Sequence, residues 1–151
     1  MITGVRIALD VGSVRIGVAK CDREGLLAIP LVTIAAGPDS VNQIFSLVID
    51  HDAICVYVGN PISLAGRETA STKLAQNFAR ELSALLVDSN ACVRMIDERL
   101  STVSAQRGMH EAGRNVKQSR DAIDQAAAVV ILEHALDSER HCDGLVGEEV
   151  S

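Results

Sequence analysis

The sequence predicts a mixed α/β domain with a five-stranded sheet and helices on both of its faces. Three strand-like runs follow one another near the amino terminus, two further apolar runs alternate with helical segments, and a long apolar helix comes last. Strands joined by short turns pair antiparallel, whereas strands separated by a helix run parallel. The sheet is therefore expected to combine both kinds of pairing.

The first three strands are separated by two turns. Residues 5–10 form a β-rich run, and an apolar run resumes at residues 16–19 after a Gly-Ser turn. A second turn, at residues 22–25, precedes a third run at residues 26–34. Pro30 in this run indicates a break or an edge strand, because proline cannot donate a ladder hydrogen bond.

Helices and buried parallel strands alternate through the middle of the chain. The spacing of apolar residues predicts helices over residues 41–50 and 68–87. Short, continuously apolar runs at residues 53–58 and 91–96 are typical of parallel strands buried on both faces.

Two helices complete the predicted domain. The first spans residues 102–112, with Ser101 as its cap, and the second begins at Ser119 or Asp121 and runs to about Asp137. The near-complete apolarity of the second helix implies burial. Residues 139–151 show no periodicity, so we expect one domain over residues 1–138 and a flexible acidic tail over 139–151.

Composition limits the possible functions. The net charge of −6 argues against a broadly basic nucleic-acid binder, although residues 99–120 hold five Arg or Lys residues and one acid. No apolar run approaches the length of a membrane span, and the amino terminus has no signal-peptide pattern, so a cytoplasmic protein without membrane contact is expected. The four cysteines are widely spaced and are expected to be reduced.

Three carboxylates interrupt apolar segments that are far apart in the sequence. Asp10 ends the first strand, Glu98 follows the last predicted strand, and Asp124 lies within the apolar final helix. Burying a carboxylate is costly unless it is paired or binds a metal. The three acids therefore suggest one cation-binding site with oxygen ligands, which suits one or two Mg²⁺ or Mn²⁺ ions and points to metal-assisted chemistry.

Four motifs in this order resemble the YqgF/RuvX family of bacterial proteins. They are Leu9-Asp10-Val11-Gly12-Ser13-Val14-Arg15-Ile16-Gly17, Val58-Gly59-Asn60-Pro61 with Gly66, Asp97-Glu98-Arg99-Leu100-Ser101-Thr102, and the run from Asp124 to Glu133. The resemblance covers roughly residues 5–135. It implies a ribonuclease-H-like fold related to that of Holliday junction resolvases, and divalent-metal nuclease activity that processes the 5′ end of precursor 16S ribosomal RNA.

Carried over from the family, the catalytic and metal-binding residues are Asp10, Glu98 and Asp124. Asp97 and Asp121 are close enough in sequence to compete, and we expect them to support the site rather than to bind metal directly. Water is the expected nucleophile. The expected phosphate contacts are Arg15, Arg99, Lys117 and Arg120.

The sequence departs from the family pattern at Asn60, Ala65 and Ala122, where the family usually has an apolar residue, an acid and a lysine. These departures affect substrate contacts more than metal binding.

Three other functions stay open at this stage. A resolvase for branched DNA would use the same chemistry, but two symmetric cuts require a two-fold dimer, whereas a monomer or weak homodimer is expected here. A binding protein for ribosome assembly intermediates would not cleave. An actin-like ATPase duplicates this architecture, and 151 residues supply one half of it.

Overall fold

The computed structural model describes residues 2–61, 68–97 and 116–150, with side chains in the last segment described from Ala122 onward. Its strands are β1 (Val5–Val11), β2 (Arg15–Cys21), β3 (Ala28–Ala35), β4 (Ala53–Asn60), β5 (Cys92–Asp97) and β6 (Glu148–Val150). Its helices are α1 (Ser40–Asp50), α2 (Ala70–Leu85) and α4 (Val116–Cys142). The helix predicted over residues 102–112 lies outside the described residues.

The strands form one mixed sheet in the order β3-β2-β1-β4-β5-β6. The first three strands pair antiparallel, β4 and β5 extend the sheet in parallel from β1, and β6 pairs antiparallel with β5. The predicted mixed sheet is confirmed. The described part of the chain contributes six strands rather than five, because β6 had no strand-like pattern in the sequence.

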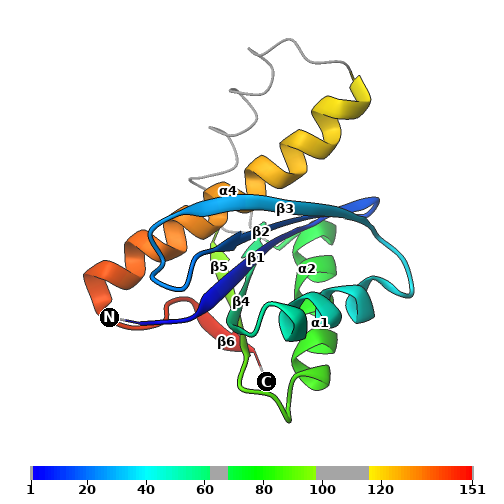
Figure 1. Cartoon of the computed structure of the whole chain (residues 1–151). Coiled ribbons are helices and arrows are strands. Elements are labelled where there is room, and N and C mark those ends of the chain that lie inside the picture. Colours follow the sequence, from blue (N-terminus) through cyan, green and yellow to red (C-terminus); the bar gives the residue numbers. More distant parts are fainter. Residues whose placement is uncertain (1, 62–67, 98–115, 151) are drawn as a thin grey trace.

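Helices cover the two faces of the sheet unequally. Figure 1 shows α1 and α2 on one face and the long helix α4 lying across the other. Because strand side chains alternate between faces, Ile7 and Leu9 pack in the cluster under α1 and α2, whereas Ala8 packs in the cluster under α4. No described helix has the length and apolarity to cross a membrane.

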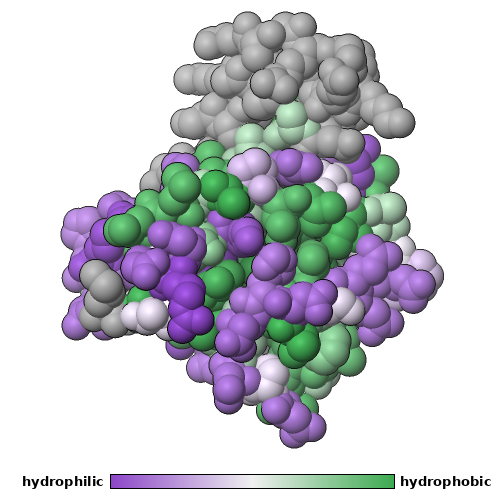
Figure 2. Space-filling view, viewed as in Figure 1, coloured by the Kyte–Doolittle hydropathy of each residue, from purple (hydrophilic) through white to green (hydrophobic). Residues whose placement is uncertain are grey.

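Strand β3 forms one edge of the sheet, as Pro30 indicated. Pro30 pairs with Ala19 next to a break in the regular register, which is where a residue without an amide hydrogen fits. The surface seen in Figure 2 mixes hydrophilic and hydrophobic side chains. Leu26 and Leu27, at the turn before β3, are among the exposed large hydrophobic residues.

The end of the chain is packed on the domain, where the sequence predicts a flexible tail. Helix α4 continues to Cys142, and β6 pairs with β5 through Val93, Arg94 and Met95. The Ser83 hydroxyl donates a 2.9 Å hydrogen bond to the Val150 carbonyl. Backbone pairing at an open sheet edge requires no apolar periodicity, so composition alone did not reveal this strand.

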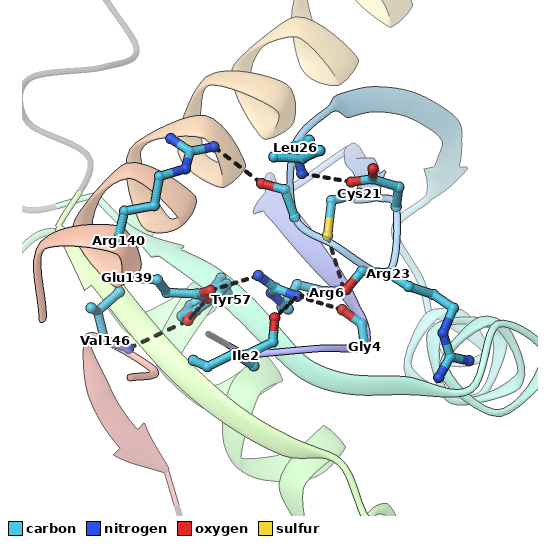
Figure 3. Close-up of polar contacts among 12 residues, drawn as sticks. Ile2, Gly4, Arg6, Cys21, Arg23, Leu26, Tyr57, Glu139, Arg140 and Val146 are labelled. Atoms are coloured by element: carbon cyan, nitrogen blue, oxygen red, sulfur yellow. Dashed lines mark hydrogen bonds and ion pairs between the residues drawn. The ribbon is translucent and has the colours of Figure 1, made fainter. Parts of the chain in front are cut away.

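A buried polar network joins α4 to the sheet (Figure 3). The Arg6 guanidinium donates a 2.7 Å hydrogen bond to Glu139, and both side chains are at most 5% exposed. The Tyr57 hydroxyl donates to the other Glu139 oxygen and accepts a hydrogen bond from the Val146 amide. Burial raises the pKa of Tyr57, which therefore stays a donor. Glu139 thus connects β1, β4 and the segment before β6.

Glu139→Ala is expected to lower the free energy of unfolding by about 3–5 kcal/mol, because it leaves the Arg6 charge buried without its partner. Urea unfolding at neutral pH measures this loss. The matched control is Glu133→Ala, on the exposed side of the same helix, which should change stability by less than about 0.5 kcal/mol. Equal effects of the two substitutions would contradict the role of the network.

Candidate active site

Asp10 lies near the carboxyl end of β1, in the middle of the sheet. Its position on the strand alternates with Leu9 and Val11, which pack under α1 and α2, so its side chain is on the α4 face. Burial, and then the nearby charge of Asp124, raise the pKa of Asp10 from 3.8 to about 6. A carboxyl group that is hard to ionise is a common feature of functional sites.

Asp124 lies near Asp10 because Gly17 lets α4 lie directly against β2. Gly17 is the antiparallel partner of Asp10. A Cβ atom at Gly17 would lie 2.0 Å from the backbone oxygen of Asp124 and 2.3 Å from its carbonyl carbon. Only glycine permits this approach, and it brings the acid of the helix to the acid of the strand. Gly17 was not among the predicted site residues, although a glycine inside a strand is a known sign of close backbone approach.

Arg15 forms an ion pair with Asp124. Its Nε atom donates a 2.7 Å hydrogen bond to Oδ2 of Asp124, and the two side chains are 31% and 20% exposed. The adjacent residue Gln125 donates a 2.9 Å hydrogen bond to the Thr33 hydroxyl, which fixes the same turn of α4 on β3. The predicted phosphate contact Arg15 is therefore placed beside one of the predicted metal ligands, Asp124.

The carboxyl ends of β4 and β5 lie next to that of β1. Leu9 is in register with Val58, and Asn60 at the end of β4 is in register with Asp97 at the end of β5. Asp97 is exposed and alternates with Ile96, which packs under α4, so Asp97 is on the opposite face from Asp10. The supporting role expected of Asp97 stays a prediction.

The remaining predicted site residues are only partly covered by the structure. Glu98 and Arg99 lie outside the described residues. Lys117, Arg120 and Asp121 belong to α4, but their side chains lie outside the description. Among the described residues, no three His, Cys, Asp or Glu side chains converge as metal ligands. Two members of the predicted trio, Asp10 and Asp124, are described, and they lie close enough to interact electrostatically.

The chemistry of these donors fits a hard divalent cation. Two carboxylates that repel each other would be relieved by a cation between them, and Mg²⁺ and Mn²⁺ prefer carboxylate oxygens. Asp124 already has a cationic partner here, because it forms an ion pair with Arg15. The location at the carboxyl ends of parallel strands is where open α/β sheets gather their functional residues.

Comparison with known proteins identifies the family. The model of the RuvX family, described as a Holliday junction resolvase, matches residues 4–138. The chain belongs to the RuvX family. A RuvX relative from Leifsonia xyli subsp. xyli, named "Putative pre-16S rRNA nuclease", is 48% identical over 142 residues, which is 93% of this chain and 90% of the relative. A relative of the same name from Thermobifida fusca is 43% identical over 99% of this chain and 98% of its own.

Solved structures confirm the predicted ribonuclease-H-like fold of this RuvX chain. RuvC from T. thermophilus, solved in complex with a Holliday junction substrate, superposes with a TM-score of 0.57 at 14% identity, over 91% of this chain and 96% of RuvC. The fowlpox virus Holliday junction resolvase gives a TM-score of 0.51 at 11% identity, over 91% of this chain and 99% of the viral protein. At these identities the likeness concerns the fold alone.

Gly17→Ala should destabilise the protein by at least about 1–3 kcal/mol, because the added methyl group meets backbone atoms of α4 that cannot rotate away. Chemical denaturation measures the change. Gly37→Ala is the matched control, since an added Cβ there has nothing within 4 Å. A Gly17→Ala protein as stable as the Gly37→Ala protein would show that α4 does not lie against β2.

The pH dependence of stability should reveal Asp10. Its pKa of about 6 in the folded protein exceeds its ordinary value of 3.8, so between these values the folded protein holds more protons than the unfolded chain. Rising pH through this window therefore lowers the free energy of unfolding of the metal-free protein, by about 2–3 kcal/mol in total.

Asp10→Asn should remove this loss, whereas the exposed control Asp88→Asn should keep the wild-type profile. Thermal unfolding from pH 4 to pH 8 in the presence of a chelator provides the measurement. Identical profiles for Asp10→Asn and the wild type would rule out the raised pKa.

Proposed function

We propose that this chain is a divalent-metal-dependent nuclease that hydrolyses phosphodiester bonds and matures the 5′ end of precursor 16S ribosomal RNA. The observation that carries the proposal is the meeting of Asp10 and Asp124, from a central strand and from α4, at the carboxyl ends of the parallel strands. The relatives named for this nuclease activity match nearly the whole chain, which supports the choice of substrate.

The proposed metal ligands are Asp10, Glu98 and Asp124. Asp10 is the rigid member, because it is held in a buried strand paired on both sides. Asp124 is held by the Gly17 contact and by the hydrogen bond of Gln125 to Thr33. Glu98 follows directly after β5, whose end is next to that of β4. Asp97 and Asp121 are assigned supporting roles.

One or two bound Mg²⁺ or Mn²⁺ ions would supply activation of the attacking water and neutralisation of charge on the phosphoryl oxygens. The protein itself positions the oxygen donors and limits their hydration. The raised pKa of Asp10 has a consequence here, because ligand binding requires the ionised carboxylate. Metal affinity should therefore fall as the pH drops below about 6.

Arg15 is proposed to contact the substrate phosphate. Its Nε atom is occupied by Asp124, and a guanidinium group has further donors that can bind a phosphate oxygen. Arg99, Lys117 and Arg120 are proposed as additional phosphate contacts, from the cationic segment that precedes and begins α4. The net charge of −6 makes a local group of cations more important for binding than the overall charge.

The proposed partners are precursor 16S rRNA and ribosome assembly intermediates, and the proposed location is the cytoplasm, where these occur. We propose a monomer or a weak homodimer. The family description as a Holliday junction resolvase favours one alternative substrate, a branched DNA. Paired symmetric cuts in a four-way junction would require a two-fold dimer.

Asp10→Asn and Asp124→Asn should each lower the rate of cleavage of a precursor 16S rRNA 5′ end by about 100-fold or more, because each removes a charged ligand worth several kcal/mol. Cleavage is measured with Mg²⁺ and with Mn²⁺, and a four-way DNA junction is assayed in parallel. Asp88→Asn, a distant and exposed acid, should cleave at the wild-type rate.

Equal cleavage by the wild type and Asp10→Asn would refute the site. Preferential cleavage of the junction by a dimeric protein would identify branched DNA as the substrate instead of RNA. Failure of the wild type to bind Mn²⁺ in titration calorimetry would favour a binding protein for ribosome assembly that does not cleave.

A further inference from the structure

Two cysteines, Cys55 on β4 and Cys92 on β5, are direct register partners. Both side chains pack in the cluster on the α4 face, so they project from the sheet on the same side. Neighbouring strands lie about 4.8 Å apart, which is within the range of Cα separations that a disulfide bond spans. Both thiols are free in the structure.

The two thiols differ in environment. Cys55 is fully buried, whereas Cys92 is partly exposed. The hydrogen bond that the Cys55 thiol donates, together with that of the Arg94 guanidinium, lowers the pKa of Cys92 to about 6. The same contact with Cys92, and burial, raise the pKa of Cys55. Cys92 is therefore the more readily ionised of the two thiols, and Cys55 holds its proton more tightly.

Arg94 is held beside Cys92 by the end of the chain. Its guanidinium contacts the carbonyl groups of Val146 and Gly147 at 3.4 Å and lies 3.8 Å from the carboxylate of Glu149. The return of the chain into β6 thus keeps a cation next to the more accessible thiol. A partly exposed thiolate with a neighbouring cation and a second thiol within reach has the features of a redox-sensing cysteine.

We propose that Cys55 and Cys92 form a redox-active dithiol that a hydroperoxide oxidises to an intramolecular disulfide. The Cys92 thiolate attacks the terminal oxygen of the peroxide, the O–O bond breaks, and the leaving oxygen takes a proton. The sulfur of Cys55 then attacks the sulfenic acid of Cys92, so that the S–S bond forms and the hydroxide leaves as water with the Cys55 proton. With hydrogen peroxide, two electrons from two thiols yield two molecules of water.

We expect this bond to be reversible. Cys92 is partly exposed, and exposed disulfides are more readily reduced than buried structural ones. The site does not depend on the proposed nuclease function, because neither cysteine belongs to the candidate active site.

The test uses the full-length, fully reduced protein and a small excess of hydrogen peroxide at pH 7. Remaining thiols are alkylated after the reaction, counted by intact-protein mass spectrometry and located by peptide mapping. We expect the wild type to lose two alkylatable thiols, mapped as a Cys55–Cys92 bridge, and to regain both with dithiothreitol. Cys142→Ser should behave identically, since Cys142 is exposed at the end of α4 and lacks a thiol partner.

Two variants separate the steps. Cys55→Ser keeps a hydroxyl donor but cannot form the bridge, so oxidation should stop at a Cys92 sulfenic acid that dimedone traps. Arg94→Gln should slow the oxidation of Cys92 at pH 7 by up to about tenfold and shift its pH profile upward, as the thiolate fraction falls. Retention of all four thiols by the wild type would overturn the proposal, as would first oxidation of Cys142 or a bridge that forms equally fast in denaturant.

Discussion

The close packing of α4 against the sheet is the constraint on which the candidate site depends. At one end of the described contact, Gly17 allows the backbone of Asp124 to lie against β2. About 22 Å further along the helix, the buried pair of Glu139 and Arg6 connects α4 to β1. Since both attachments are to the first two strands, the orientation of the helix and the position of its acid beside Asp10 are set together.

Buried acids at the two ends of the contact between α4 and the sheet differ in how their charge is balanced. Glu139 is balanced by a guanidinium and a phenol, so its burial supports the fold. Asp10 is instead buried near a second carboxylate. Both conditions disfavour its ionised form, and they raise its pKa. Glu139 is paired with a cation in a closed network, whereas at the carboxyl ends of the strands the ion pair seen among the described residues joins the partly exposed Arg15 to Asp124 and not to Asp10. That imbalance is what a divalent cation would correct.

Much of the fold followed from local patterns. The apolar runs located five strands, and the helical spacing located α1 and α2 to within two residues and α4 to within five, because periodicity reports the burial of one face. The end of the chain escaped prediction for a physical reason. Glu139 looks like a solvated acid until Arg6, 133 positions away, is seen to contact it. Likewise β6 is formed by backbone pairing to the open edge of β5. Its three residues include two glutamates and show no pattern that predicts a strand.

By itself, the sequence determined the order of the elements, the family motifs and two acids, Asp10 and Asp124, that are out of place in apolar segments. Such features are local, since each depends on neighbours within one strand or helix. Only the tertiary structure decided that Asp124 meets Asp10 and Arg15, that Asp97 is on the opposite face, and that Cys55 and Cys92 are in register. These relations depend on strand register and on the closest approach of two backbones, and both are set by packing between segments far apart in the chain.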